Sequence, residues 1–241
     1  MNTEAGLERC LSFINCQLQP PRSPEPGNED SLRRLTITLS RQAGCGAHPV
    51  AESLAKLLQS GQAEACPWAI FDRNLVEKVL DEHNLPSRLA RFMPEDKISE
   101  LSDTMDELFG LHPPSWTLVR KAAETILHLA ELGNVIIIGR AAHVITSRLD
   151  NVFHVRLVGS IENRVQYVQK VAGVSAKAAL ARIQSEDLGR KRYLRKYFGK
   201  DIDDPLLYHL TLNMDWLTCE AAGRLIAEAA RMKASRLTAV R

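Results

Sequence analysis

A short loop of small residues carries the clearest chemistry in this chain. The apolar residues 35–39 predict a β-strand and an amphipathic helix is predicted from Pro49, so residues 40–47 form the turn between them. Gly44 and Gly46 in this turn would let backbone N–H groups approach an anion closely. The start of a helix adds its positive dipole end to such a site. The spacing therefore predicts a phosphate-binding loop.

The loop differs from the Walker motif, which reads G-x-x-x-x-G-K-[ST]. Gly46 aligns with the second glycine of that motif, and Arg41 then stands at the first. Ala47 takes the place of the lysine, and His48 takes the place of the Ser/Thr. The pattern predicts phosphate binding more directly than ATP hydrolysis. An ordinary turn between a strand and a helix is the alternative.

Charged residues also follow two further apolar segments, residues 68–71 and 135–138. The polar residues at the three strand ends are Ser40, Arg41, Asp72, Arg73, Gly139 and Arg140. The carboxyl ends of parallel strands share one edge of a sheet, where ligands bind, so we expect these residues to converge on one site. Two of them also have a structural explanation, because Asp72 could cap the next helix and Arg140 could pair with a carboxylate.

The order of elements predicts an α/β fold. Residues 135–138 form a continuous apolar run between two glycines, which is typical of a strand buried on both faces of a parallel sheet. The expected strands are 35–39, 68–71, 135–138, 152–158 and 208–212, and the expected helices are 49–59, 74–83, 115–132, 160–171, 175–198 and 218–234. This alternation is typical of a three-layer, doubly wound, parallel five-stranded sheet.

A change in composition separates residues 1–30 from the rest of the chain. Four prolines and a glycine between residues 19 and 28 indicate a linker, so residues 1–30 are expected to form a flexible tail. Residues 31–241 are expected to fold as one domain. Within it, prolines and short acidic stretches in residues 84–115 indicate a helical insertion.

Bulk composition narrows the function classes and the setting. The net charge of +2 and an aromatic content of 5% disfavour a nucleic-acid binder. No apolar run reaches the ~18 residues of a membrane span, and no signal peptide is expected. The five cysteines contain no C-x-x-C pair, so neither a disulfide framework nor a zinc site is expected. A reducing cytoplasm is the expected setting.

The chain resembles the cytidylate kinase-like family, a branch of the P-loop nucleoside monophosphate kinases. The resemblance lies in several motifs that occur in the family's order. They are TLSRQAGCG at 38–46, FDRNLVE at 71–77, IGRAAHVI at 138–145, Asp187 followed by Arg190, YFGKD at 197–201, and YHLTLN at 208–213. Together they span roughly residues 35–235, so the resemblance covers most of the chain.

The resemblance implies a P-loop kinase fold and phosphoryl transfer from ATP to CMP or dCMP with Mg²⁺, for which no ligand residue is identified. ATP would be bound by Ser40, Arg41, Gln42, Ala43, Gly44, Cys45, Gly46, Ala47 and His48. The monophosphate would be bound by Asp72, Arg73, Gly139, Arg140 and Asp187. The expected catalytic residues are Arg41, Arg190 and Arg195, the last two on a lid-like segment, 175–204. Small-molecule nucleotides are the expected partners, with no nucleic acid and no membrane.

Departures from the family pattern leave alternatives open. Ala47 replaces the second glycine of a G-G pair, while Ala141 and His143 replace a glycine and an aspartate. The chain could therefore be a nucleotide-binding module with impaired catalysis. The basic cluster in residues 190–200 could instead contact nucleic acid, and Cys45 could be a thiol of lowered pKa rather than a small filler.

Overall fold

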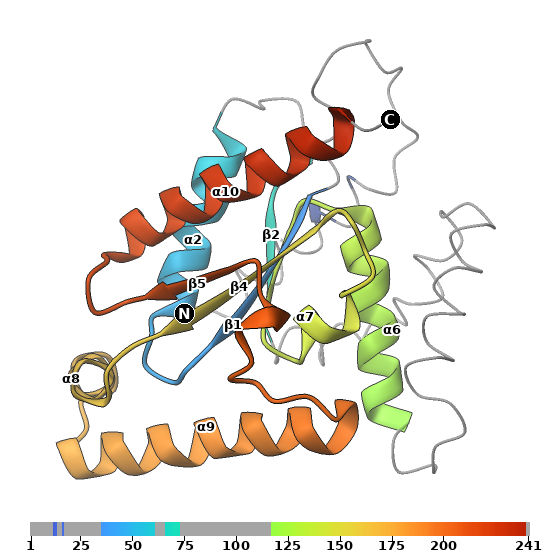
Figure 1. Ribbon diagram of the computed structural model, residues 1–241. Helices are drawn as coiled ribbons and strands as arrows, with labels where there is room; N and C mark the ends of the chain where they lie inside the picture. The colour runs from blue at the N-terminus through green and yellow to red at the C-terminus, as the bar shows by residue number, and fades with distance from the viewer. Residues whose placement is uncertain (1–11, 14–15, 17–34, 61–65, 73–116, 240–241) are drawn as a thin grey trace.

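The computed structural model describes residues 12–13, 16, 35–60, 66–72 and 117–239. Within them, five parallel strands form one sheet in the order β2-β3-β1-β4-β5 (Figure 1). The strands are β1 (Thr36–Arg41), β2 (Ala69–Phe71), β3 (Val135–Ile138), β4 (Val152–Val158) and β5 (Leu210–Asn213). After β1 the chain continues to β2 at one edge of the sheet, and after β4 it continues to β5 at the other edge. Doubly wound sheets bind ligands at the carboxyl ends of two neighbouring strands that diverge in this way.

Helices cover both faces of the sheet and make three layers (Figure 1). The helices are α2 (Ala47–Gln59), α6 (Thr117–Leu132), α7 (Ala142–Ile145), α8 (Ile161–Ala172), α9 (Ala176–Phe198) and α10 (Cys219–Ala239), with a 3₁₀ turn, η3 (Pro205–Leu207). α2 and α10 pack on one face, whereas α6 and α7 cover the other. This is the doubly wound α/β fold that the alternation of elements predicts.

The continuous apolar run of β3 reflects burial on both of its faces. Ile136 and Ile138 pack against α2 and α10, whereas Val135 and Ile137 pack against α6. All four side chains are fully buried, because successive side chains of a strand point to opposite faces of the sheet. The prediction of a strand covered by helices on both sides is confirmed.

β1 turns a row of polar side chains toward the face that α6 covers. Thr36 Oγ1 donates a hydrogen bond to the carbonyl oxygen of Ala130 at 2.9 Å. Thr38 Oγ1 lies 2.9 Å from His154 Nδ1. Ser40 is the next member of this row and is also buried. The central strand therefore delivers a buried hydroxyl to the carboxyl end of the sheet.

α8 and α9 begin at the capping residues that the sequence predicts. Ser160 Oγ accepts a hydrogen bond from Asn163 N at 3.4 Å, and Ser175 Oγ accepts one from Ala178 N at 3.3 Å. Gly173 ends α8 in the left-handed conformation, with a φ of 65°. α9 then runs past the carboxyl ends of the strands (Figure 1). The caps thus position the helix that closes one side of the candidate site.

Some boundaries differ from the predicted ones. α2 begins at Ala47, two residues before Pro49, and β5 begins at Leu210 instead of residue 208. The single turn of α7 is not predicted, because four residues carry too little periodicity to be recognised. The predicted helix 74–83 and the predicted insertion 84–115 lie outside the described residues.

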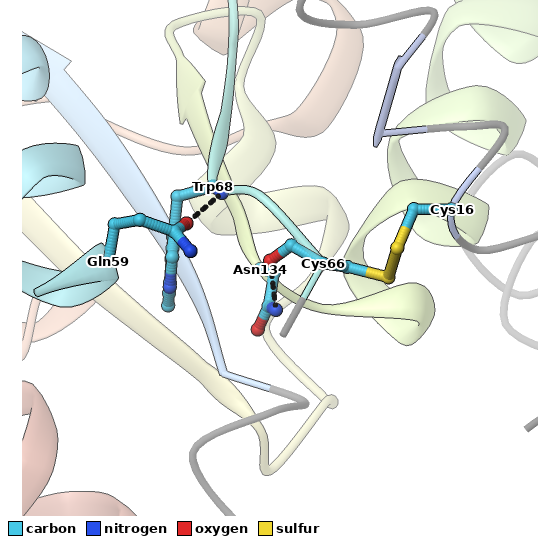
Figure 2. Close-up of a disulfide and its surroundings, with 5 residues drawn as sticks. All are labelled: Cys16, Gln59, Cys66, Trp68 and Asn134. Carbon is cyan, nitrogen blue, oxygen red and sulfur yellow. Dashed lines mark hydrogen bonds between the residues drawn. A yellow bond between two sulfur atoms is a disulfide. The ribbon is translucent and has the colours of Figure 1, made fainter. Parts of the chain in front are cut away.

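A disulfide joins Cys16 to Cys66, with an S–S distance of 2.12 Å (Figure 2). The prediction that the cysteines form no disulfide is therefore wrong for this pair. An odd number of scattered cysteines does not reveal that two of them, separated by 50 positions, lie side by side in the fold. The cytoplasmic expectation loses the support that it drew from the cysteines.

Phe13 belongs to the hydrophobic core, with none of its surface exposed. Its ring meets the ring of Phe71 edge to face, with centroids 6.1 Å apart. The expectation of a flexible tail over residues 1–30 therefore does not hold at Phe13 and Cys16, which are packed and bridged. The other residues of that range, apart from Ser12, lie outside the described part of the chain.

None of the helices in the described ranges combines the length and the apolarity that crossing a bilayer requires.

Candidate functional site

One pocket of about 610 Å³ collects the ends of three strands. Arg41 is the last residue of β1, Asp72 follows β2 and Arg140 lies in the turn after β3, and all three line this pocket. The other lining residues are Ser40, His48, Gly139, Ala141, His143, Ser185, Glu186, Gly189, Arg190, Tyr193, Leu194 and Ile202. The expected convergence of the strand ends is confirmed as geometry, whereas the binding roles stay predictions. Arg73 lies outside the described residues.

The glycines of the loop permit close packing as well as a tight turn. Gly44 has a φ of 87° and Gly46 a φ of 66°, the left-handed region that glycine adopts without strain. A Cβ at Gly44 would lie 2.8 Å from the carbonyl oxygen of Arg164 in α8. α8 therefore covers the loop, and Ala43, Cys45 and Ala47 are buried beneath their neighbours.

A carboxylate of the protein already occupies part of the loop. Ala43 N donates to Asp187 Oδ1 at 2.7 Å, and the same carboxylate pairs with Arg164 at 2.5 Å and with Arg190 at 3.0 Å. Cys45 N bonds instead to the carbonyl oxygen of Gln42 at 3.4 Å. A backbone N–H that donates to a carboxylate oxygen can also donate to a phosphate oxygen, so the loop has the polarity of an anion site. The predicted residue Asp187 thus lies at the loop.

Gln42 has a structural part in this arrangement. Its backbone N donates to the carbonyl oxygen of Leu157 at 3.0 Å, and its side-chain oxygen accepts from Gly159 N at 3.0 Å. Both bonds tie the loop to the end of β4 and the turn after it. Gln42 therefore fixes the loop against the sheet.

Arg41 lies across the turn that follows β3. Gly139 has a φ of 83°, and a Cβ at this position would overlap Arg41 Nη1. Burial, together with the nearby charge of Arg190, lowers the pKa of Arg41 to about 10, so it stays charged at neutral pH. Gly139 is thus needed for the position of Arg41.

The turn after β3 holds two non-glycine residues in the left-handed region. The φ is 55° at Arg140 and 56° at Ala141. Such strain persists where the surrounding structure demands it, and it gathers at functional sites. Ala141 replaces the glycine of the family pattern, yet it adopts a glycine-like conformation. The strained turn aims Arg140 at the pocket.

His48 and Asp72 face each other across the pocket wall. His48 Nε2 lies 3.6 Å from Asp72 Oδ2. His48 Nδ1 is buried and has no hydrogen-bond partner. No group of three metal-binding side chains occurs in the ranges that the structure describes. The histidine at the Ser/Thr position therefore contacts an acidic pocket residue.

The two predicted lid arginines are placed differently. Arg190 lines the pocket and pairs with Glu186 at 2.6 Å. Arg195 is exposed in the last turn of α9 and is absent from the lining of the pocket. Five residues along a helix correspond to roughly 140° around its axis, so the two side chains cannot share one direction. The geometry gives no support to a catalytic role for Arg195.

Burial sets the charge state of two other groups near the loop. It raises the pKa of the Cys45 thiol to about 11, so the alternative of a lowered thiol pKa is wrong. Burial and the charge of Arg156 lower the pKa of His143 to about 4. His143 is therefore neutral at neutral pH, and its Nε2 lies 3.3 Å from the hydroxyl of Tyr208.

Sequence reasoning missed Arg156, a buried arginine on β4 beside the loop. It lies opposite Ser40 in the register of β1 and β4, and its Nη1 donates to Ser40 Oγ at 3.0 Å. The sequence does contain an indication of this site, because Arg156 is the one Lys, Arg, Asp or Glu residue in the strand over residues 152–158. A buried arginine at the carboxyl end of a central strand needs an anionic partner.

The comparisons with known proteins agree with this architecture. A model described as the cytidylate kinase-like family matches residues 36–216. The chain is 28% identical over 181 residues to a cytidylate kinase of Pyrococcus horikoshii, covering 75% of this chain and 80% of that one. It is 30% identical over 70 residues to a cytidylate kinase of Aeropyrum pernix, covering 29% of this chain and 41% of that one.

A solved structure of an uncharacterised protein from Eubacterium ventriosum has the same fold. It superposes with a TM-score of 0.55 at 20% identity, covering 83% of this chain and 99% of that one. The family match extends over all five strands and the whole of α9. On this match, the chain belongs to the cytidylate kinase-like family.

Proposed function

We propose that this chain transfers the terminal phosphoryl group of ATP to CMP or dCMP. The observation that carries the proposal is the pocket where Arg41, Arg140 and Arg190 meet beside the glycine loop. Phosphoryl transfer needs little covalent chemistry from a protein, because positioning and charge neutralisation supply most of the rate. A pocket lined by three arginines suits two nucleotides whose phosphates must be brought together.

Each residue has a distinct task in this proposal. Backbone N–H groups of the loop hold the phosphates of ATP, and Arg41 supplies the charge that Ala47 lacks at the lysine position. Arg140 binds the monophosphate through paired N–H donors. Arg190 comes from α9 and neutralises charge on the transferred group. α8 and α9 together exclude water from the phosphates.

Mg²⁺ fits this chain as an ion that arrives with the nucleotide. Such an ion usually keeps several waters and is bound mainly by phosphates, so a cluster of three protein ligands is not required. It would neutralise charge on the β- and γ-phosphates. Asp72 and Glu186 line the pocket, and either carboxylate could contact one of its waters. A cytoplasmic setting stays part of the proposal, although the Cys16–Cys66 disulfide does not support it.

The test is ADP production from ATP and Mg²⁺ with a panel of acceptors: CMP, dCMP, UMP and AMP. The proposal expects turnover that requires a pyrimidine monophosphate and saturates with CMP or dCMP. No turnover with any acceptor would overturn it.

A nucleotide-binding module without catalysis is the second candidate. Buried Ala47 leaves the end of the loop without a cationic side chain, and losing one preorganised donor typically costs about 10²–10³ in rate. This candidate predicts that ATP or CMP stabilises the fold without phosphoryl transfer. A thermal-shift scan over nucleotides, followed by the ADP assay, separates the two.

A further inference from the structure

A second pocket of about 250 Å³ lies beside the first and is rich in cations. It shares Arg41, Arg190 and Ile202 with the first pocket, and it adds Arg156 and Lys191. Four positive side chains around so small a volume repel one another unless an anion lies among them. Two carboxylates in the lining of the same pocket supply that negative charge in this structure.

Arg156 is the fixed member of this group. Its side chain is only 5% exposed, and its guanidinium carbon lies 5.5 Å from the centre of the Tyr208 ring. The Tyr208 hydroxyl donates to the carbonyl oxygen of Ile202 at 2.9 Å, which holds the ring in place. One guanidinium nitrogen donates to Ser40 and the other faces the second pocket. Arg156 is therefore oriented in advance toward an anion.

One of these two carboxylates, that of Asp203, bridges two of the cations. Its Oδ1 accepts from Arg156 Nη2 at 2.8 Å, and its Oδ2 accepts from Lys191 Nζ at 3.0 Å. Two oxygens thus bridge two cations, as two oxygens of a phosphate would. Asp203 is 53% exposed and Lys191 is 45% exposed, so solvent can reach this bridge. The Lys191–Asp203 pair is exposed and therefore weak, and a dianionic phosphate can compete with the single carboxylate of Asp203 for Arg156.

The neighbouring carboxylate shows the same arrangement at the loop. Asp187 bridges Ala43 N, Arg164 and Arg190. Asp187 lies in α9, and Asp203 lies in the segment that follows this helix. Each carboxylate accepts a hydrogen bond from a donor near the carboxyl end of β1 or β4. The donors most suited to phosphate oxygens are therefore covered by acidic groups of one segment.

We propose that the second pocket is a phosphate subsite, formed by Arg156 and Lys191, from which the phosphate chain of the nucleotide displaces Asp203. The inference rests on the proposed function and adds Arg156 to its binding residues. Leaving Arg156 buried without a counter-ion is costly, so Asp203 pairs with it until a phosphate takes its place. Binding of the nucleotide and docking of residues 201–204 are thus competitive.

The test measures binding of ATP, and separately of inorganic pyrophosphate, by calorimetry at low ionic strength. Asp203→Asn is expected to raise the affinity for both by roughly two- to five-fold, the strength of an exposed ion pair. Asp204→Asn is the matched control: it removes one charge at the next position and keeps the oxygen that accepts from Leu206 N. The control is expected to leave both affinities unchanged.

Lys191→Gln and Arg156→Met test the cations. Lys191→Gln, at the surface, is expected to lower pyrophosphate affinity roughly two- to five-fold. Arg156→Met is expected to lower it by at least about ten-fold, since hydrogen bonds to charged groups are stronger. If Arg156→Met fails to fold, the affinities of Lys191→Gln and Asp203→Asn still test the subsite.

The inference is overturned if Asp203→Asn weakens anion binding or behaves like Asp204→Asn, because a structural bridge predicts that result. Its failure is distinct from failure of the proposed function. If the protein turns over CMP but Asp203→Asn does not raise the affinity for pyrophosphate, only the subsite is overturned. A gain in pyrophosphate binding without turnover would support the subsite and overturn the transferase.

Discussion

Two regions joined by β2 are held together by different forces. Just before the strand, a disulfide joins Cys66 to Cys16 (Figure 2). At the end of the strand, Phe71 packs on Phe13, and the two contacts secure an edge of the core. After the strand, Asp72 enters a pocket where charged side chains meet. The first region is held by a covalent bond, apolar packing and hydrogen bonds to the backbone, whereas the second is rich in charged side chains. Stability and chemistry should therefore respond to separate changes, although the same strand serves both.

The largest effect is expected from Arg140→Ala, in the charged region. Loss of one positioned cation should lower kcat/KM for CMP by about 10²–10³-fold, mainly through KM, because the monophosphate loses its paired donors. Steady-state kinetics at varied CMP would measure it. Arg224→Ala, which removes an exposed arginine of α10, should leave the kinetics unchanged. Equal kinetics for the two variants would remove Arg140 from the binding site.

The bridged region should affect stability and leave the chemistry almost intact. Cys66→Ser opens a loop of 50 residues and should lower the free energy of unfolding by about 2–4 kcal/mol. Urea denaturation with and without dithiothreitol would measure it, and the reductant should destabilise only the unmodified chain. Cys219→Ser, at a free cysteine, is the control. If KM for CMP rises as steeply in Cys66→Ser as in Arg140→Ala, stability and chemistry do not respond to separate changes.

Gly139→Ala should disturb both stability and site. The φ of 83° and the overlap with Arg41 should together cost about 1–3 kcal/mol of unfolding free energy and weaken ATP binding. Gly173→Ala is a matched control, since its φ is 65° and nothing lies within 4 Å of the new methyl group. Denaturation and ATP titration of both variants separate backbone strain from the overlap. Equal ATP affinity in both would show that Arg41 does not depend on Gly139.

The free energy of unfolding should also depend on pH. Burial lowers the pKa of His143 to about 4 and that of His154 to about 3, below the ordinary value of 6.5. As the pH falls below about 6.5, these two histidines therefore bind protons in the unfolded chain but stay neutral in the folded chain. The free energy of unfolding should drop by up to about 1.4 kcal/mol per pH unit for each histidine.

Urea denaturation at pH 7, 6 and 5 measures this slope. His143→Gln should reduce this slope by the contribution of one histidine. A stability that is constant from pH 7 to pH 5 would contradict the buried neutral state of both rings.

Local patterns allowed the sheet and much of the pocket to be predicted. Residues 152–158 form β4 as expected, and Ser160 and Gly173 bound α8, because strand periodicity and capping act over a few residues. The convergence of Arg41, Asp72 and Arg140 follows from parallel strands alone.

Contacts between distant segments could not be predicted in this way. The Cys16–Cys66 bridge and the pairing of Arg156 with Asp203 depend on how separate elements pack. The close approach of Arg164 to Gly44 is of the same kind. Arg195 differs, since its helical phase relative to Arg190 was available from the sequence and argued against a shared site.

The rate of ADP formation from ATP and Mg²⁺ as CMP is varied tests the central claim most directly. The account predicts a rate that requires CMP or dCMP, saturates with it, and falls sharply in Arg140→Ala. A rate that stays at background with CMP, dCMP, UMP and AMP would contradict it.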